Sequence, residues 1–253
     1  MGLILAYLAQ GGKASSATTE QDRPAQPSAQ QPQSQEPQKP AEEVYKNIQV
    51  LKGLPANRLM GAMQFFARSL GVKCDHCHVG RDFPKDDKPT KTTARMMYRM
   101  VQVGQKMIES NKVSCFMCHR GHVEPEPVPD EIKAAVDAKM KEGEKNTKPA
   151  EKAYKNIQVL KGVPAGRIMG IMTAFSKSLG VDCTFCHVGK AFAKDDKPEK
   201  QTARKMIAMV GTFTKDFFHG EMTVNCYTCH RGEKEPVAFP PPPPQQEQKK
   251  PGN

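Results

Sequence analysis

The sequence predicts a mainly α-helical fold that consists of two related halves with little regular sheet. Residues 45–53 recur without change as residues 154–162, and later segments repeat at the same offset of 109. Apolar residues return at helical spacing in both halves, while no stretch shows the strict alternation of a half-buried strand. Two copies of one module form a pseudo-symmetric pair rather than a long stack of repeats.

Each half is expected to contain two main helices. Leu59, Met63 and Phe66 stand at helical spacing in the first of them, and Gly71 is a suitable stop. A shorter charged helix is expected between the halves, with Asp130 as its N-terminal cap and its end near Gly143. The four main helices predicted in this way cover residues 57–70, 92–110, 165–179 and 201–217.

The composition indicates a core that is small for the length of the chain. Only 38% of the 253 residues are hydrophobic, 6% are aromatic and none is tryptophan. A large apolar ligand inside the protein would account for this deficit. The formal net charge of +11 is spread along both halves, without a phosphate-binding loop or a nucleic-acid motif. No nucleic acid is therefore expected as a partner.

Composition and the repeat divide the chain into five predicted segments. Residues 1–43 are rich in Gln, Pro and Ser and are expected to form a disordered tether with the remnant of a signal peptide. The apolar run at residues 1–9 is too short to span a bilayer as a helix. Membrane contact is therefore expected to be peripheral or through this segment. The other segments are a first module at 44–123, a linker with the charged helix at 124–150, a second module at 151–235 and a Pro-rich disordered tail at 236–253.

All eight cysteines fall in four Cys-x-x-Cys-His motifs. Two thiols at this spacing can bond to the two vinyl groups of one haem, and the histidine that follows can ligate its iron. The sequence therefore predicts four covalently attached c-type haems, and such attachment favours the periplasmic face of the inner membrane. The attaching cysteines are Cys74, Cys77, Cys115, Cys118, Cys183, Cys186, Cys226 and Cys229, and the iron-ligating histidines are His78, His119, His187 and His230.

Two other uses of these motifs are weaker. Structural zinc is bound by cysteine and histidine, but a histidine directly after the second cysteine is poorly placed to complete the same tetrahedron. Four disulfides are arithmetically possible, but they would leave the histidine after every cysteine pair unexplained.

The sixth iron ligand decides whether a haem carries electrons or binds small molecules. Met63 and Met172 each lie 11 residues before the first cysteine of a motif, on a predicted helix that a glycine turn follows. The chain can therefore fold back over the distal face of that haem. Met60 and Met169 are the local competitors, and core packing is the alternative role for any methionine on an apolar helix face.

The distal ligand of the second haem in each half stays open on spacing alone. Met97 aligns with Met206 across the repeat, and Met100 aligns with Met209. One methionine of each half, on the helix before the motif, is the natural candidate. A chain with 14 methionines also has many that are not ligands.

Three histidines lie outside the motifs. His76, inside the first motif, is expected at the surface. His122 is expected either at the surface or as a ligand that reaches the other half. His219 lies in the loop before the last motif, where it could ligate an iron or be a solvated loop residue.

With these residues, the chain resembles the tetrahaem cytochrome subunit of purple-bacterial-type photosynthetic reaction centres over residues 45–232. The resemblance is carried by the repeated Asn-Ile-Gln-Val-Leu segment, the Cys-His-Val motif ends, and the Thr-Ala-Arg-Lys-Met segment that ends at Met206. It implies two pseudo-symmetric two-haem halves and electron donation to the photo-oxidised pigment pair on the periplasmic side. The family's ligand pattern selects Met63, Met97 and Met172.

The chain departs from the family pattern at the fourth haem. The family commonly takes a distal histidine from the loop before the second motif, but residues 98–114 contain no histidine. The fourth haem is therefore expected to use Met206. By pseudo-symmetry, His219 could reach the second haem and replace Met97. The lipid-bearing N-terminal cysteine usual in the family is also absent, since all eight cysteines belong to motifs.

The sequence thus predicts a multihaem cytochrome c that carries electrons and is not an enzyme. A membrane-bound photosynthetic reaction centre is the expected redox partner, and methionine ligation favours midpoint potentials mostly above zero. The close likeness of the halves also fits a periplasmic or extracellular carrier in a non-photosynthetic chain. A multihaem redox enzyme is the least favoured interpretation, because it would need an open distal position and every haem has a methionine candidate.

Overall fold

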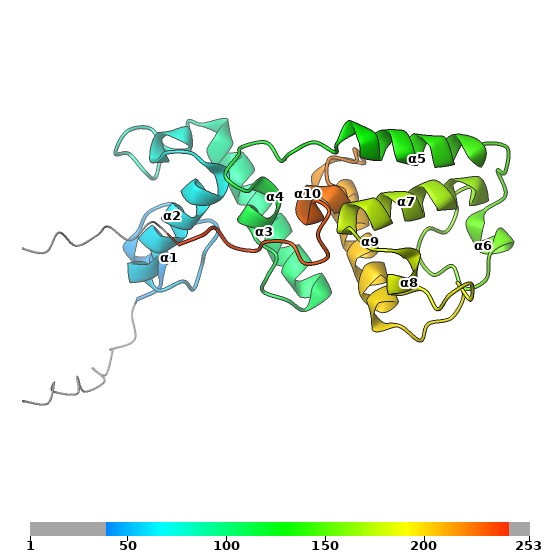
Figure 1. The fold of residues 1–253 in the computed structure, drawn as a ribbon. Coiled ribbons are helices and arrows are strands. Elements are labelled where there is room, and N and C mark those ends of the chain that lie inside the picture. The colour runs from blue at the N-terminus through cyan, green and yellow to red at the C-terminus, as the bar shows by residue number, and fades with distance from the viewer. Residues whose placement is uncertain (1–38, 243–253) are drawn as a thin grey trace, which may run out of the picture. The chain divides into compact units, whose positions relative to one another are not determined.

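The computed structural model describes residues 39–242 and shows a mainly α-helical protein (Figure 1). Within these residues, strand pairing is limited to isolated bridges such as the one between Pro40 and Pro55. The predicted fold class is confirmed. The helices are α1 (Ala41–Val44), α2 (Leu59–Leu70), α3 (Pro89–Ile108), α4 (Cys115–His119), α5 (Asp130–Glu142), α6 (Ala150–Ala153), α7 (Ile168–Leu179), α8 (Cys183–Cys186), α9 (Pro198–Phe217) and α10 (Cys226–His230).

The first main helix of each module ends where the sequence predicts. α2 and α7 stop at Gly71 and Gly180, which take left-handed φ values of 65° and 64°. A Cβ atom at Gly71 would clash with the carbonyl oxygen of Gly121, and one at Gly180 would clash with that of Gly232. The Gly121 N–H also donates to the backbone carbonyl of Ser69 at 2.9 Å. Glycine is required at both stops because the turn behind the second motif packs there.

The second main helix of each module begins earlier than predicted. α3 starts at Pro89 and α9 at Pro198, ahead of the expected starts at Thr92 and Gln201. Proline suits the first helical position, because its missing N–H has no partner inside the helix and its φ is already helical. The two Asp-Asp-Lys-Pro segments are therefore helix starts as well as loops.

An apolar cluster joins α3 of the first module to α9 of the second. The two helices run antiparallel, since Glu109 after the end of α3 pairs with Lys205 near the start of α9 at 3.3 Å, while Gly104 lies beside Phe213. This cluster packs the two modules against each other. Its buried members are Met100, Met209, Phe213 and Val224.

The linker after the first module carries α5, which packs along α7 of the second module (Figure 1). The helix is where the sequence predicts and ends at Gly143, but Asp130 is its first residue and not its cap. Pro129 occupies the position before the helix and has no side chain that could cap it. The Asp130 carboxylate instead pairs with Lys133 at 2.9 Å and lies in the first turn, where the helix dipole favours a negative charge.

The chain after the second module returns to the first one. Residues 236–242 were expected to belong to a disordered tail, yet the Phe239 ring lies 6.3 Å from the Phe65 ring on α2. The Ser114 hydroxyl, just before α4, donates to the carbonyl of Ala238. The Pro-rich composition of this segment predicts disorder. It does not indicate that Phe239, an apolar residue within the segment, packs against the first module. The rest of the predicted tail, residues 243–253, lies outside the described residues.

Packed structure begins before residue 44, the predicted start of the first module. Ala41 is fully buried, and its N–H donates to the carbonyl of Leu54 at 2.7 Å. The corresponding Ala150, at the end of the predicted linker, donates to Val163 at 2.8 Å. The predicted signal remnant and most of the tether, residues 1–38, lie outside the described residues. No helix between residues 39 and 242 is long and apolar enough to cross a membrane.

Candidate haem-attachment sites

Each Cys-x-x-Cys-His motif forms a short turn that follows one main helix after a loop. The first motif of each module follows α2 or α7, and the second motif forms α4 after α3 or α10 after α9. Ser114 caps α4 by accepting from the Met117 N–H, and Asn225 caps α10 by accepting from the Thr228 N–H. All eight cysteines are free thiols. The structure therefore brings the two thiols and the histidine of each predicted site into one turn.

The cysteines that open the second motifs are the more deeply enclosed. Burial raises the pKa of Cys115 and of Cys226 to about 11. Cys74 and Cys183, which open the first motifs, are exposed instead.

The motif histidines are oriented as iron ligands by their own loops. The Nδ1 atom of His78 lies 3.2 Å from the carbonyl oxygen of Phe83, that of His119 lies 3.1 Å from His122, and that of His230 lies 3.0 Å from Glu233. An Nδ1–H that donates to a backbone carbonyl leaves Nε2 as the unprotonated, metal-binding nitrogen. Three of the four sites thus hold the tautomer that a haem iron needs.

The fourth histidine, His187, has the equivalent aromatic neighbour but no hydrogen-bond partner at Nδ1. Its ring lies 5.2 Å from the Phe192 ring, as the His78 ring lies 5.2 Å from the Phe83 ring. Its Nδ1 atom is buried without a hydrogen-bond partner. Burial lowers the pKa of all four motif histidines, and nearby backbone carbonyls act in the opposite direction. Neutral imidazole is the form that binds a metal.

Large apolar side chains stand exposed beside the motifs. Val79 and Phe83 flank His78 with 39% and 49% of their surface exposed, and Phe192 near His187 is 57% exposed. Side chains of this kind normally cover a binding site when they gather around a few polar groups. A flat, largely apolar macrocycle attached at the neighbouring thiols would cover them. The residues present therefore fit a covalently attached haem.

The predicted distal methionines all lie on the main helices. Met63 on α2 and Met172 on α7 are half-buried, whereas the competitors Met60 and Met169 are 63% and 55% exposed. The assignment of Met63 and Met172 as ligands remains a prediction.

The two candidate pairs of methionines for the second haems differ in how deeply they are buried. Met100 and Met209 are 8% and 7% exposed and pack inside the cluster between α3 and α9. Met97 and Met206 are only partly buried at the margin of the same cluster. A methionine that fills an inter-helix core has its side chain committed to packing. This favours Met97 and Met206 as the distal candidates.

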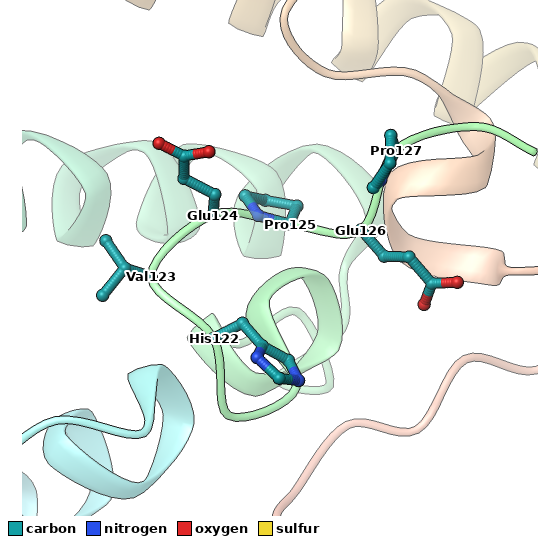
Figure 2. A pocket seen from close by; sticks show the side chains of 6 residues that line it. All are labelled: His122, Val123, Glu124, Pro125, Glu126 and Pro127. Carbon is teal, nitrogen blue, oxygen red and sulfur yellow. The ribbon is translucent and has the colours of Figure 1, made fainter.

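The histidines outside the motifs have different surroundings. His76 is half-buried, and its carbonyl accepts from the Thr90 hydroxyl at 2.6 Å. His122 and His219 are exposed. Figure 2 shows His122 at the start of an open groove that residues 122–127 line. Its carbonyl accepts from the proximal His119, so its backbone supports the proximal side of the second site.

The second motifs of the two modules meet each other. The side chains of Cys118 and Cys229 lie against each other, and each is the second cysteine of its motif. Arg231, next to the motif of the second module, donates through Nη2 to the carbonyl of Cys118 at 2.7 Å, and Arg120 reaches the carbonyl of Cys229 at 3.5 Å. These arginines were not singled out in the sequence, although an Arg-Gly pair follows both second motifs. The structure thus places two predicted attachment sites side by side.

A polar cluster explains the most strictly repeated segment of the sequence. The Asp86 carboxylate accepts from Asn47 at 2.9 Å and Gln49 at 3.3 Å, both in that segment, and from Arg95 on α3 at 2.9 Å. It also pairs with Lys91 at 2.9 Å. The second module repeats the cluster around an aspartate. Its members are Asp195, Asn156, Gln158, Lys200 and Arg204.

Comparison with known proteins assigns the chain to a family. The family model described as the photosynthetic reaction centre cytochrome C subunit matches residues 7–147 and again residues 130–250. The chain belongs to this family. Membership of this cytochrome family confirms the predicted resemblance, and it implies covalently bound haem.

Individual members of the reaction centre cytochrome family align with most of the chain. The photosynthetic reaction center cytochrome c subunit of Thermochromatium tepidum is 26% identical over 247 residues, which cover 78% of this chain and 61% of that protein. The subunit of Rubrivivax gelatinosus is 27% identical over 256 residues, covering 78% of this chain and 68% of that protein. Cytochrome c-554 of Chloroflexus aurantiacus is 37% identical over 82 residues, which cover 30% of this chain and 20% of that protein.

Proposed function

We propose that this chain carries electrons through four covalently attached c-type haems and donates them to a photosynthetic reaction centre at the periplasmic face of a membrane. The observation that carries this proposal is the set of four complete motifs, in which the second sites of the two modules meet at Cys118 and Cys229. Membership of the reaction centre cytochrome family supports the acceptor.

Each bound haem would supply a reversible one-electron change at its iron. The cysteines would fix the position of each haem, and the loops behind His78, His119 and His230 would leave Nε2 free to bind the iron. Arg231 and Arg120, which donate across to the carbonyls of Cys118 and Cys229, would hold the attachment sites of the two modules next to each other. These roles belong to an electron carrier and not to an enzyme.

The distal ligands complete the proposal. We assign Met63 and Met172 to the first haem of each module, and Met97 and Met206 to the second. Methionine in this position raises the reduction potential of a haem. A methionine at every iron would also leave no open position for a substrate.

His219 is the one competitor that the fold favours at the second haem of the first module. α9 runs antiparallel to α3, and Phe217 and Phe218 at its end pack against the same cluster as Met97. His219 follows Phe218 directly and is exposed. The two ligands are separable, because histidine and methionine give ferric haems different near-infrared charge-transfer bands.

A haem and ligand analysis of the purified protein tests the carrier function. We expect the mass to show four attached haems and reduced samples to bind carbon monoxide slowly. Met63→Ala should open one iron to carbon monoxide and lower its potential, because the alanine cannot ligate. Met60→Ala is the matched control and should change neither property. Fewer than four haems, or an effect of Met60→Ala in place of Met63→Ala, would contradict the proposal.

A carrier of a non-photosynthetic chain is the second candidate. The repeated segments of the two modules favour it, since residues 45–53 and 154–162 are identical. Both candidates predict the same haem content and the same ligands. They differ in whether the haems become oxidised after a flash of light.

A further inference from the structure

We infer that Lys91 and Lys200 are positioning residues that act on the proximal histidine of the first haem site in each module and raise the potential of that haem. The inference rests on the proposed function, because it concerns haems attached at the first motifs. It assigns a role to two buried charges that haem attachment itself does not require.

Lys91 is buried to an unusual degree for a lysine. It is 9% exposed, and its Nζ atom donates to the backbone carbonyls of Phe83 at 2.8 Å, Pro84 at 3.1 Å and Lys85 at 2.6 Å. The same atom pairs with Asp86 at 2.9 Å. Lysine is almost never buried unless it is paired. Here the ammonium group organises the whole loop that follows the first motif.

One of these carbonyls is shared with the proximal histidine. The Phe83 oxygen accepts from Lys91 and lies 3.2 Å from Nδ1 of His78. A carbonyl that already accepts from a cation gives less electron density to a second donor. The His78 ring therefore gains less anionic character and donates less strongly to iron. Weaker donation favours the reduced iron, and the nearby positive charge acts in the same direction.

The second module has a buried lysine at the same helix position, although Nδ1 of His187 has no hydrogen-bond partner there. Lys200 is also 9% exposed and donates to the carbonyls of Phe192 at 2.8 Å and Lys194 at 2.6 Å. It pairs with Asp195 at 2.9 Å. Phe192, whose carbonyl accepts from Lys200, has its ring 5.2 Å from the His187 ring, so the charge lies close to that histidine. The recurrence of the buried lysine and its aspartate at the same positions in both modules argues against an accident of packing.

The second sites of the modules lack this device. His119 and His230 face the carbonyls of His122 and Glu233. In the part of the chain that the structure describes, no lysine or arginine side chain donates to either carbonyl. The effect of the lysines is therefore confined to the first haem of each module.

The Asp86 cluster carries one net positive charge, and Lys88 is a further cation near His78. Asp86 balances one of the two cations, Lys91 and Arg95, that bind it. Asn47 and Gln49 hold the carboxylate from the other side without adding charge. Removing the lysine and removing the aspartate should therefore move the potential in opposite directions.

The experiment is a spectroscopic redox titration of the purified holoprotein. Lys91→Met should shift one of the four midpoint potentials downward and leave the other three in place. Lys91→Arg should restore part of the shift, and Asp86→Asn should shift the same potential upward. Lys200→Met should act on a different single haem.

Lys85→Met is the matched control. Its side chain is 55% exposed in the same loop, so solvent screens its charge and the potentials should stay unchanged. Unchanged potentials in a folded Lys91→Met protein would overturn the inference, as would equal shifts in the control. If Lys91→Met fails to fold, the direction of the Asp86→Asn shift decides, and a shift downward or none overturns it. Fewer than four haems in the unaltered protein would instead refute the proposed function.

Discussion

Asp86 and Asp195 show how single residues hold the first site of each module together. Each carboxylate is bound by a buried lysine and a buried or half-buried arginine, and Gln158 reaches Asp195 as Gln49 reaches Asp86. Hydrogen bonds from these partners keep the pKa of both carboxyl groups far below the ordinary value. The identical segments in the two halves are therefore explained by the aspartate that each segment binds in its own module, and not by apolar packing.

The lowered pKa values of Asp86 and Asp195 predict that acid destabilises the fold. A carboxyl group with a lowered pKa in the folded state stabilises it above the unfolded pKa of about 4. That contribution is lost as the pH falls further and the group becomes protonated. In Asp195→Asn the charge is absent at every pH, so the melting temperature of the holoprotein should decline less between pH 5 and pH 2 than in the unaltered protein. Parallel curves for the two proteins would contradict the role given to Asp195.

At the scale of helices, α3 and α9 join the modules through unequal residues. Gly104 and Phe213 occupy equivalent positions under the 109-residue repeat, and they face each other. A Cβ atom at Gly104 would lie 2.8 Å from Cζ of Phe213. A small residue on one helix thus accepts a large one from the other, which two identical helices could not do.

The contact between Gly104 and Phe213 predicts that a larger side chain at residue 104 lowers the stability of the protein. Gly104→Leu should lower the free energy of unfolding by about 1–3 kcal/mol, because extra atoms in a packed core force neighbouring side chains aside. Denaturant titration of the holoprotein measures it. Adding Phe213→Ala should recover part of the loss.

Gly211 provides the control for the same helix pair. It is exposed on α9, and an added Cβ there would meet no atom within 4 Å. Gly211→Ala should therefore be neutral or stabilising by about 0.5–1 kcal/mol. Equal losses for both glycines would show that the contact with Phe213 does not matter.

The sequence allowed the main helices and the motif residues to be predicted, for local reasons. Helical spacing and the stop at Gly71 are properties of neighbouring residues, and a Cys-x-x-Cys-His motif is complete within five. The start of α3 at Pro89 was placed too late because the Asp-Asp-Lys-Pro segment also fits a loop. The contacts of Phe239 with the first module could not be predicted, since composition does not show where a segment docks.

In the whole molecule, the two modules contact each other in three places. α3 packs on α9, the second motifs meet at Cys118 and Cys229, and the chain after each second motif contacts the other module. Long-range pairings of this kind are not encoded in local pattern, so the repeat predicted two modules but not how they pair. The same pairing is what places attachment sites of both modules next to each other.

The chain spans 61% of the length of the Thermochromatium tepidum subunit that it matches. The chain's membership of the family is established. The identity of its electron acceptor depends on the complete assembly and stays a proposal. An acceptor that light oxidises distinguishes the favoured function from a carrier in a dark chain. Light is also the one stimulus that an experiment can apply in a single short step.

Laser-flash absorption spectroscopy of native membranes that contain this cytochrome tests the central claim most directly. The account predicts that haem absorbance bleaches within microseconds of the flash, in step with re-reduction of the photo-oxidised pigment. The bleaching should disappear from membranes of a strain that lacks the cytochrome. Pigmented membranes with the cytochrome present and no flash-induced haem oxidation would contradict the proposed function.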